Sequence, residues 1–352
     1  MTAKGVYFSF FIGLILLSTV FTGCGVSKST ITYETTFLGF SQQGAHARAL
    51  YANDKMVVIG GKDGHISMVF FDTSLVSQKM RTENVKIEDF RDVHCATNGN
   101  CLFMNAGKNG LIYGISSFGS TLVLFDTTGV FFDGLSFWNE RDGILYGDPI
   151  NGSFFLAKTS NKGRDWQAYT PNSFPKALEN EAGFAASGTG IQTVGDSTVY
   201  FGTGVGKTAR LFASYDQGKN WVAKNTQMRS GDSYGIYSLF FWSKYEGVIV
   251  GGSYIDSTFK DGVCQLTTNG GDSWKDRSKG LLGYCSCVHG SKNGDLLVAT
   301  GRMGTFYSVN KGKSWKILTT RSYYSCNVTD THIVLSGKNG ELEFIKYKRI
   351  TQ

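Results

Sequence analysis

Three arginines supply the strongest anion-binding chemistry in this chain: Arg48, Arg91 and Arg210. The planar guanidinium group of arginine binds a carboxylate through two parallel hydrogen bonds. Each of the three lies at the start or end of an expected strand, at matching points of three separate units of the chain. If the fold brings them together, they form a positively charged surface suited to carboxylates or to an acidic segment of a partner. The alternative is that each arginine pairs with a nearby acid and stiffens its own unit.

Two acidic residues lie where an expected strand passes into a loop: Asp148, in Gly147-Asp-Pro149, and Glu181. Both could bind a ligand around the central channel of a propeller, because binding residues are often carried on loops. The alternative is that they cap turns or pair with the arginines in a buried network, as Asp92 could do beside Arg91. The residue types leave both hypotheses open.

Potential metal ligands are concentrated in one short stretch, Cys285-Ser-Cys287-Val-His289. Alternation along a strand would place all three side chains on one side. The sequence offers no second ligand pair at a spacing typical of zinc fingers. A disulfide or a buried thiol is therefore favoured, and no metal or cofactor is predicted.

An even number of cysteines follows Cys24, which favours disulfides in an exported protein. These cysteines are Cys95, Cys101, Cys264, Cys285, Cys287 and Cys326. Cys95 and Cys101 flank Thr97-Asn-Gly99, so a hairpin would bring them together. Cys287 and Cys326 occupy similar places in successive units and could face each other.

The first thirty residues form a targeting segment rather than part of the fold. An almost unbroken apolar run covers residues 5–21, and small residues then lead to Phe21-Thr-Gly-Cys24-Gly25. This stretch resembles a bacterial lipobox, in which the cysteine is acylated. We predict a signal peptide over 1–23, lipidation of Cys24 and a short tether over 24–30. The alternative is an uncleaved anchor helix, since the run is nearly long enough to span a bilayer. Either way, the protein is exported and held at a bacterial cell membrane, on its outer-membrane or periplasmic side rather than in the cytoplasm.

The composition of the chain favours a single all-β domain over residues 31–352. Its 45 glycines, 3 prolines and 14% aromatic residues suit many short strands joined by glycine turns. The net charge of +7 is spread along the chain. Without a basic cluster, the sequence gives no support for nucleic-acid binding.

One turn recurs four times between positions 159 and 315: Ser/Thr-x-Asp/Asn-x-Gly-x-x-Trp. The copies contain Asn161, Gly163 and Trp166; Asp216, Gly218 and Trp221; Asn269, Gly271 and Trp274; and Asn310, Gly312 and Trp315. The Asp or Asn side chain can accept from amides of the turn, the Gly takes a positive φ, and the Trp buries a large ring. Each copy closes a β-hairpin. Successive Trp residues are 55, 53 and 41 positions apart, which is typical of one propeller blade per repeat.

Three further units, within 57–70, 102–113 and 333–344, repeat a strand, a Gly-Lys-Asx-Gly turn and a strand. Together with the four Trp-ended units they predict a seven-bladed β-propeller, with six or eight blades left open. An open ring would expose strand edges. Residues 31–37 alternate well and have no partner of their own, so we predict that they supply the outer strand of the last blade.

The repeated turn is the Asp-box, or bacterial neuraminidase repeat, and the chain around it resembles the photosystem II stability/assembly-factor-like family of exported propellers. The resemblance rests on Phe90-Arg-Asp92, Gly147-Asp-Pro149 and the segments 181–189, 210–221, 235–241 and 251–254. The family has an Asp where this chain has Ser253. The resemblance implies a propeller that holds a partner protein, as the photosynthetic members do with an arginine-lined face.

Sialidases share the Asp-box propeller and use an arginine triad, a Tyr nucleophile with a Glu partner, and an Asp acid. Tyr284 or Tyr323 could be proposed as that Tyr. The Arg-Ile-Pro signature of sialidases is absent, because the equivalent stretch is Arg48-Ala-Leu-Tyr51. An oxidoreductase has less support still, since no Gly-x-Gly-x-x-Gly opens a helix.

We therefore predict a monomeric, membrane-anchored propeller that is not an enzyme and that binds a protein or glycan partner in the cell envelope, as an assembly or interaction factor. The candidate partner-binding residues are Arg48, Arg91, Arg210, Asp148 and Glu181. No catalytic residue is assigned. The alternative is a sialidase-like glycan hydrolase or a glycan-binding lectin, which an exposed Tyr–Glu pair beside clustered arginines would favour.

Overall fold

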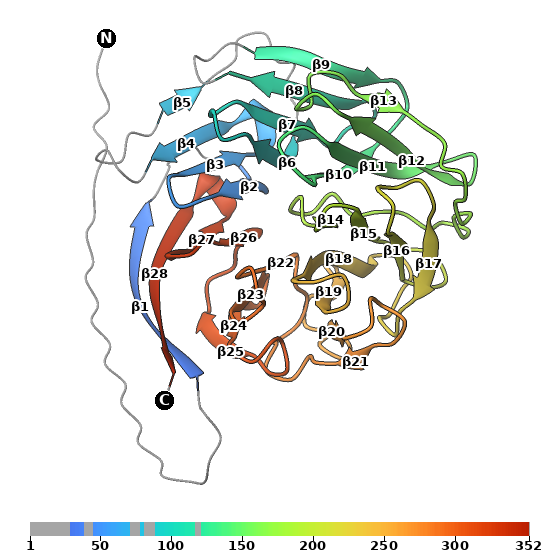
Figure 1. Ribbon diagram of the computed structural model, residues 1–352. Coiled ribbons are helices and arrows are strands. Elements are labelled where there is room, and N and C mark those ends of the chain that lie inside the picture. Colours follow the sequence, from blue (N-terminus) through green and yellow to red (C-terminus); the bar gives the residue numbers. More distant parts are fainter. Residues whose placement is uncertain (1–28, 39–44, 71–77, 81–88, 117–120, 352) are drawn as a thin grey trace.

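The computed structural model describes residues 29–38, 45–70, 78–80, 89–116 and 121–351, and Cys24 lies outside them. These residues form seven four-stranded antiparallel sheets, which lie as blades around a common axis (Figure 1). The predicted all-β, seven-bladed propeller is confirmed. No helix within these described ranges is long and apolar enough to cross a membrane.

Blades 1 to 6 each run in chain order from an innermost strand at the axis to an outermost strand at the rim (Figure 1). Blade 1 contains β2 (Ala49–Ala52), β3 (Met56–Gly60), β4 (Ile66–Phe70) and β5 (Gln78–Met80), and blade 2 contains β6 (Phe90–Cys95), β7 (Cys101–Asn105), β8 (Gly110–Ile115) and β9 (Thr121–Thr127). Blade 3 contains β10 (Phe132–Phe137), β11 (Gly143–Ile150), β12 (Ser153–Thr159) and β13 (Gln167–Ala168), and blade 4 contains β14 (Ile191–Val194), β15 (Thr198–Gly202), β16 (Arg210–Ser214) and β17 (Val222–Asn225). Blade 5 contains β18 (Tyr234–Phe241), β19 (Gly247–Ser253), β20 (Cys264–Thr267) and β21 (Lys275–Asp276), and blade 6 contains β22 (Cys287–Gly290), β23 (Leu297–Gly301), β24 (Gly304–Ser308) and β25 (Lys316–Thr319).

Blade 7 joins the two ends of the chain. Its strands are β26 (Ser325–Val328), β27 (His332–Ser336), β28 (Leu342–Thr351) and, outermost, β1 (Ser29–Leu38). β1 pairs with β28 in antiparallel register from Ser29 opposite Thr351 to Leu38 opposite Leu342, and Figure 1 shows β1 in blue beside β28 in red. The predicted closure is confirmed, and the closing strand starts two residues before the expected Ile31.

The middle strands of the blades are buried on both faces. Every residue of β3, β15 and β23 is buried, which is why the sequences of these strands are continuous apolar runs rather than alternating ones.

Adjacent blades share their cores. The ring of Phe201 stacks on Phe212 of its own blade and, at 4.5 Å between centroids, on Tyr146 of blade 3. Packing between blades therefore sets the positions of the loops.

The four Asp-box turns join the third and fourth strands of blades 3 to 6. In blade 4, Asp216 Oδ1 accepts from the amides of Lys219 and Asn220 at 3.0 and 2.9 Å. Gly218 has a φ of 76°, and the indole of Trp221 donates to its carbonyl at 3.0 Å. These contacts make the turn rigid and tie it to the buried ring.

The two ends of the ring carry different loops. Because paired strands are antiparallel, the first and third strands of a blade run in the same direction. The starts of the innermost strands adjoin one another, as shown by the hydrogen bonds from Ser325 Oγ to Arg48 O and from Ser286 Oγ to Tyr324 O. We call this end, which also carries the turns between second and third strands, the arginine end. The Asp-box turns lie at the opposite end, the Asp-box end.

Candidate functional site

The starts of the innermost strands at the arginine end, which we call the mouth of the ring, gather cationic and aromatic side chains from several blades. Arg48 precedes β2, Arg91 is the second residue of β6, Tyr284 precedes β22, and Arg302 lies in the turn between β23 and β24. Burial lowers the pKa of Arg48, and the charge of Arg91 lowers it further. Burial raises the pKa of Tyr284, while Arg48, Arg302 and Arg91 oppose that rise. The four groups therefore lie within electrostatic reach of one another.

Arg48 keeps its hydrogen-bond donors available. Its guanidinium carbon lies 4.2 Å from the centroid of the Tyr324 ring, and the Tyr324 hydroxyl is 3.0 Å from His46 Nδ1. Within the part of the chain that the structure describes, the guanidinium group of Arg48 makes no hydrogen bond or ion pair. A stacked, half-buried arginine with free donors is suited to an anionic group of a ligand.

Arg91 is held more firmly. Its Nε and one terminal nitrogen donate to Asp89 Oδ2 at 2.9 and 2.7 Å, and its other terminal nitrogen donates to Ala185 O at 2.8 Å. Ala185 belongs to the segment that leads from blade 3 to blade 4, so Arg91 fixes this segment against blade 2. Asp89 neutralises part of the charge of Arg91, whereas Arg48 has no such partner among the described residues.

An aromatic wall faces the arginines from blades 5 and 6. Phe184 stacks on Tyr237 at 3.8 Å, and Tyr237 meets Tyr284 edge-on at 4.8 Å. The Tyr237 hydroxyl donates to Ser233 O at 2.7 Å. Tyr237 and Tyr284 are buried, whereas Phe184, from the segment between blades 3 and 4, is half-buried. Phe184 is therefore the ring of this group that can place an apolar surface near a bound carboxylate.

The structure does not bring Arg210 or Glu181 to this mouth. Arg210 begins the third strand of blade 4, away from the axis, and its side chain is 9% exposed. It forms an ion pair with Glu181, whose side chain is 0% exposed. Glu181 also accepts from Thr203 Oγ1 at 2.6 Å and from the Leu178 amide at 2.8 Å. For Arg210 and Glu181, the structure thus shows the alternative hypothesis, in which the arginine pairs with a nearby acid in a buried network.

Asp148 likewise does not join the arginines: it is half-buried, and together with the buried Asp133 and Asp92 it surrounds Tyr146. Asp148 Oδ1 accepts from the Gly183 amide at 3.0 Å, and the fully buried Asp133 lies against it. Burial raises the pKa of Asp92 to about 7, against hydrogen bonds from the Leu135 and Val93 amides. Burial, and then the charge of Asp148, raise the pKa of Asp133 well above 3.8. Asp133 was not predicted as a candidate residue, although an acid within the apolar strand 132–137 is a signal for a buried carboxyl group.

Asp133→Asn should flatten the dependence of stability on pH. A buried acid with a raised pKa binds a proton more tightly in the folded state, so folding loses free energy as pH rises above 3.8, the ordinary value. The slope is about 1.4 kcal/mol per pH unit for one proton. Urea denaturation at several pH values between about 5 and 8 measures the free energy of unfolding. This free energy should fall less steeply with rising pH in Asp133→Asn than in the wild type. The exposed substitution Asp272→Asn is the control, and equal slopes for all three proteins would contradict the assignment.

Both tyrosines proposed as a nucleophile are buried, and Tyr284 is 5% exposed. Tyr323 is 1% exposed and its hydroxyl donates to Glu343 Oε2, which is also buried. Burial and then Glu343 raise the pKa of Tyr323. Arg321 lies 4.0 Å from Glu343. A Tyr–Glu pair beside an arginine thus exists, but it is enclosed in the core between blades 6 and 7.

The structure joins Cys95 and Cys101 in a disulfide between β6 and β7. Cys287 and Cys326 are buried free thiols whose sulfur atoms are 3.6 Å apart. Although burial acts in the opposite direction, hydrogen bonds from Cys326 and Thr189 lower the pKa of Cys287 to about 7. A disulfide between Cys287 and Cys326 therefore stays a prediction.

The Cys-x-Cys-x-His stretch does not share one face. Cys285 lies before β22 and packs in the core between blades 5 and 6, whereas Cys287 packs between blades 6 and 7. His289 Nδ1 accepts from the Val328 amide at 3.0 Å. Among the described residues, no cluster of His, Cys, Asp or Glu could hold a metal ion.

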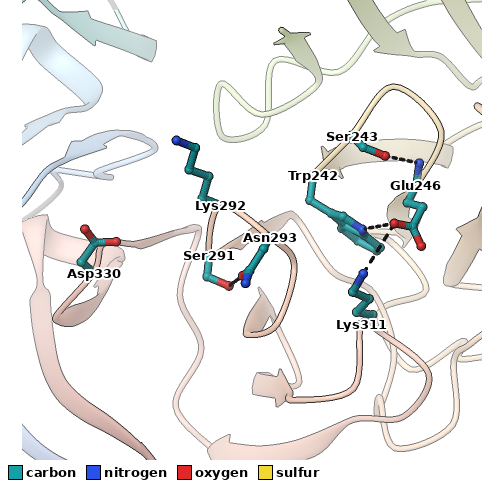
Figure 2. Close-up of a pocket in the computed structure, with 8 residues that line it drawn as sticks. All are labelled: Trp242, Ser243, Glu246, Ser291, Lys292, Asn293, Lys311 and Asp330. Carbon is teal, nitrogen blue, oxygen red and sulfur yellow. Dashed lines mark hydrogen bonds and ion pairs between the residues drawn. The ribbon is translucent and has the colours of Figure 1, made fainter.

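The Asp-box end has a shallow depression around Trp242, lined by loops of blades 5, 6 and 7 (Figure 2). The indole of Trp242 donates to Glu246 Oε2 at 3.1 Å, and Lys311 Nζ lies 3.5 Å from the same oxygen. A Cβ at Gly294 would lie 2.4 Å from the indole, so this backbone packs against the ring. Trp242, Glu246 and Lys311 satisfy one another, and Lys292 and Asp330 stand apart from them in Figure 2.

Solved structures similar to this chain include β-propellers of low sequence identity. No protein-family model matches the chain, and no curated protein matches it. The WD40 β-propeller domain of Doa1 is 14% identical, with a TM-score of 0.63 over 89% of this chain and 97% of that domain. Virginiamycin B lyase from Staphylococcus aureus, as an inactive variant with quinupristin, is 12% identical, with a TM-score of 0.60 over 90% of this chain and 99% of the lyase. A selenomethionine form of the same lyase is 13% identical, with a TM-score of 0.61 over 90% of this chain and 99% of the lyase.

These similarities define the class of protein, a seven-bladed β-propeller distantly similar to WD40 and virginiamycin B lyase propellers. At 12–14% identity they show the fold alone. The particular activity of this chain must be argued from its own residues.

Proposed function

We propose that this chain is a membrane-anchored propeller that binds a protein partner in the cell envelope and catalyses no reaction, with an acidic segment of the partner held at the arginine end. The observation that carries the proposal is the Arg48 guanidinium group, stacked on Tyr324 and without a hydrogen-bond partner among the described residues. An arginine left with free donors at the mouth of the ring has no evident structural use for them.

The neighbours of Arg48 support the same ligand chemistry. Arg91 and Arg302 add positive charge, and both act, like Arg48, on the buried Tyr284. Partial burial of Arg48 strengthens its attraction for a carboxylate, because fewer water molecules screen the charges. The half-buried Phe184 offers apolar surface beside the charged groups, and the buried Tyr237 supports its ring. The site therefore suits a peptide segment in which an acidic residue lies next to an apolar one.

The role as an assembly factor, the lipid anchor and the exported location are proposed from the sequence. The resemblance to photosystem II stability/assembly-factor-like propellers supports an assembly or interaction factor, since photosynthetic members hold a partner protein. Cys24 lies outside the described residues, so the lipid anchor and the exported location rest on the sequence of residues 1–30. The buried Tyr323–Glu343 pair favours a binding protein over a sialidase-like hydrolase, because a glycan cannot reach it.

Replacing both Arg48 and Arg91 by Ala should abolish capture of the partner. Tagged wild-type protein and the double variant would be recovered from native membranes, and the proteins that co-purify would be identified. We expect the partner only with the wild type, with capture that weakens as salt is raised because it is ionic. Arg48→Ala alone should also weaken capture, and its thermal midpoint should stay within about 5 °C of the wild type, since Arg48 makes only a stacking contact. The double variant also loses the bonds from Arg91 to Asp89 and Ala185 O and should melt lower than Arg48→Ala.

Arg164→Ala is the matched control, because Arg164 is exposed in an Asp-box turn at the other end of the ring. It should leave capture unchanged. Capture of the same partner by the Arg48/Arg91 double variant would contradict the proposal, and so would a partner that Arg164→Ala alone fails to retain.

A further inference from the structure

A second hollow, of about 300 Å³, lies at the Asp-box end over the seam between blades 4 and 5. It is separated from the arginine end by the length of the innermost strands. Its walls include Tyr215, Lys224, Lys244, Tyr245, Asn269 and Asp272. The proposed function makes no use of any of these residues.

Two tyrosine rings at this hollow face solvent. Tyr215 is 42% exposed and Tyr245 is 54% exposed. The fold does not require the ring of Tyr215, because the same position of the other three Asp-box turns holds a small or aliphatic residue. These residues are Ser160, Thr268 and Val309. Two exposed aromatic side chains that line the same hollow, one of them absent from the other repeats, form a surface suited to a ligand.

The walls are fixed before any ligand arrives. Lys224 Nζ donates to the Tyr215 hydroxyl at 2.8 Å and to Gly270 O at 2.9 Å, and it forms an ion pair with Asp272 at 2.7 Å. The Lys224 side chain is 15% exposed, whereas that of Asp272 is 67% exposed. Lys224 therefore braces the wall from beneath, and Asp272 keeps carboxylate surface open to the hollow.

The opposite wall is braced in the same way. The loop that carries Lys244 and Tyr245 is held by the buried Tyr200, whose hydroxyl donates to Lys244 O at 2.5 Å. The Gly270 amide donates to Tyr245 O at 2.8 Å. The ammonium group of Lys244 lies 4.8 Å from the Tyr245 ring centroid. Fixed walls lower the entropy cost of binding, because few side chains must be ordered.

We propose that this hollow binds a pyranose ring of a glycan between Tyr215 and Tyr245. The C–H face of a pyranose is apolar and lies against an aromatic ring, while its hydroxyl groups both donate and accept hydrogen bonds. Asp272 can accept from those hydroxyls and Lys244 can donate to them. A volume of about 300 Å³ is at the lower end for ligand pockets, and it suits one or two sugar residues rather than a folded partner.

The depression around Trp242 shows what a closed aromatic site looks like at the same end of the ring (Figure 2). There the indole is covered by Gly294, and its N–H is already bonded to Glu246. Tyr215 and Tyr245 keep a large part of each ring uncovered. The sugar site is therefore assigned to the seam between blades 4 and 5, not to the larger depression.

Titration of the purified domain with maltotriose, chitotriose and sialyllactose tests the proposal, by saturation-transfer NMR and calorimetry. At least one of these sugars should bind with a dissociation constant of about 1 mM or tighter. Tyr245→Ala should weaken that binding about tenfold or more, and Tyr245→Trp should preserve it, because the ring supplies the contact. Tyr245 is exposed, so its replacement should leave the thermal midpoint unchanged.

Tyr254→Ala is the matched control, since Tyr254 is 46% exposed in the turn between second and third strands of blade 5, at the arginine end. It should bind the sugar as the wild type does. Absence of binding by all three sugars at about 10 mM, or binding that survives Tyr245→Ala, would overturn the proposal. The Arg48/Arg91 double variant should retain sugar binding, so either proposal can fail without the other.

Discussion

Arg210→Ala should lower the free energy of unfolding by about 3–5 kcal/mol, the usual cost of breaking a buried ion pair from one side. The substitution leaves the Glu181 carboxylate fully enclosed, with Thr203 and the Leu178 amide as its remaining partners. It also frees Lys176 O, which now accepts from Arg210 at 2.8 Å. Urea denaturation at pH 7 measures the loss.

Arg164→Ala serves again as the control and should change the free energy of unfolding by no more than about 0.5 kcal/mol. Arg210→Ala should still capture the partner at low temperature, where the domain stays folded. A loss of stability below about 1 kcal/mol together with lost capture would contradict the structural role of Arg210. It would return Arg210 to the recognition surface that the sequence suggested.

Deleting residues 29–38 should destabilise the whole domain. The deletion removes every pair between β1 and β28 and leaves β28 as an open edge. It also uncovers the core of blade 7, against which the 6%-exposed Ile31 packs. We expect the thermal midpoint to fall by about 10 °C or more, or the domain to aggregate. Scanning calorimetry of the soluble fraction measures the change.

Two point substitutions test the packing of β1 without shortening the chain. Ile31→Asp places a charge in the core and should lower the midpoint strongly, whereas Thr32→Asp, on the exposed side of the same strand, should have little effect. A deletion variant that melts like the wild type would show that β1 does not hold the ring closed.

The propeller could be predicted from the sequence because its information is local and repeated. An Asp-box turn needs a positive φ at Gly218 and a capping carboxylate at Asp216, and both needs are met within eight residues. Four such turns at blade-like intervals predict a ring. The spare alternating strand at 31–37 then predicts how that ring closes, since an unpaired edge is unfavourable.

The candidate site could be predicted only in part, because it depends on which strand of a blade carries a residue. Arg48 and Arg91 precede or begin innermost strands and reach the mouth of the ring, while Arg210 begins a third strand and is buried. Nothing in the local sequence of Arg210 distinguishes these positions. Tyr324 meets Arg48 across a separation of 276 residues (324 against 48), which no local pattern reveals. Arg302 was missed for the same reason.

The pairing of β1 with β28 also determines the order in which the molecule can fold. Ser29 lies opposite Thr351, so the first strand to be synthesised finds its partner only when the last strand has been made. Closing so long a loop is slow, because its entropy cost comes before any contact rewards it. Until then the nascent chain carries an unpaired strand at its leading end, exposed to aggregation or to chaperones. A chain that stops before Leu342 could never bury it.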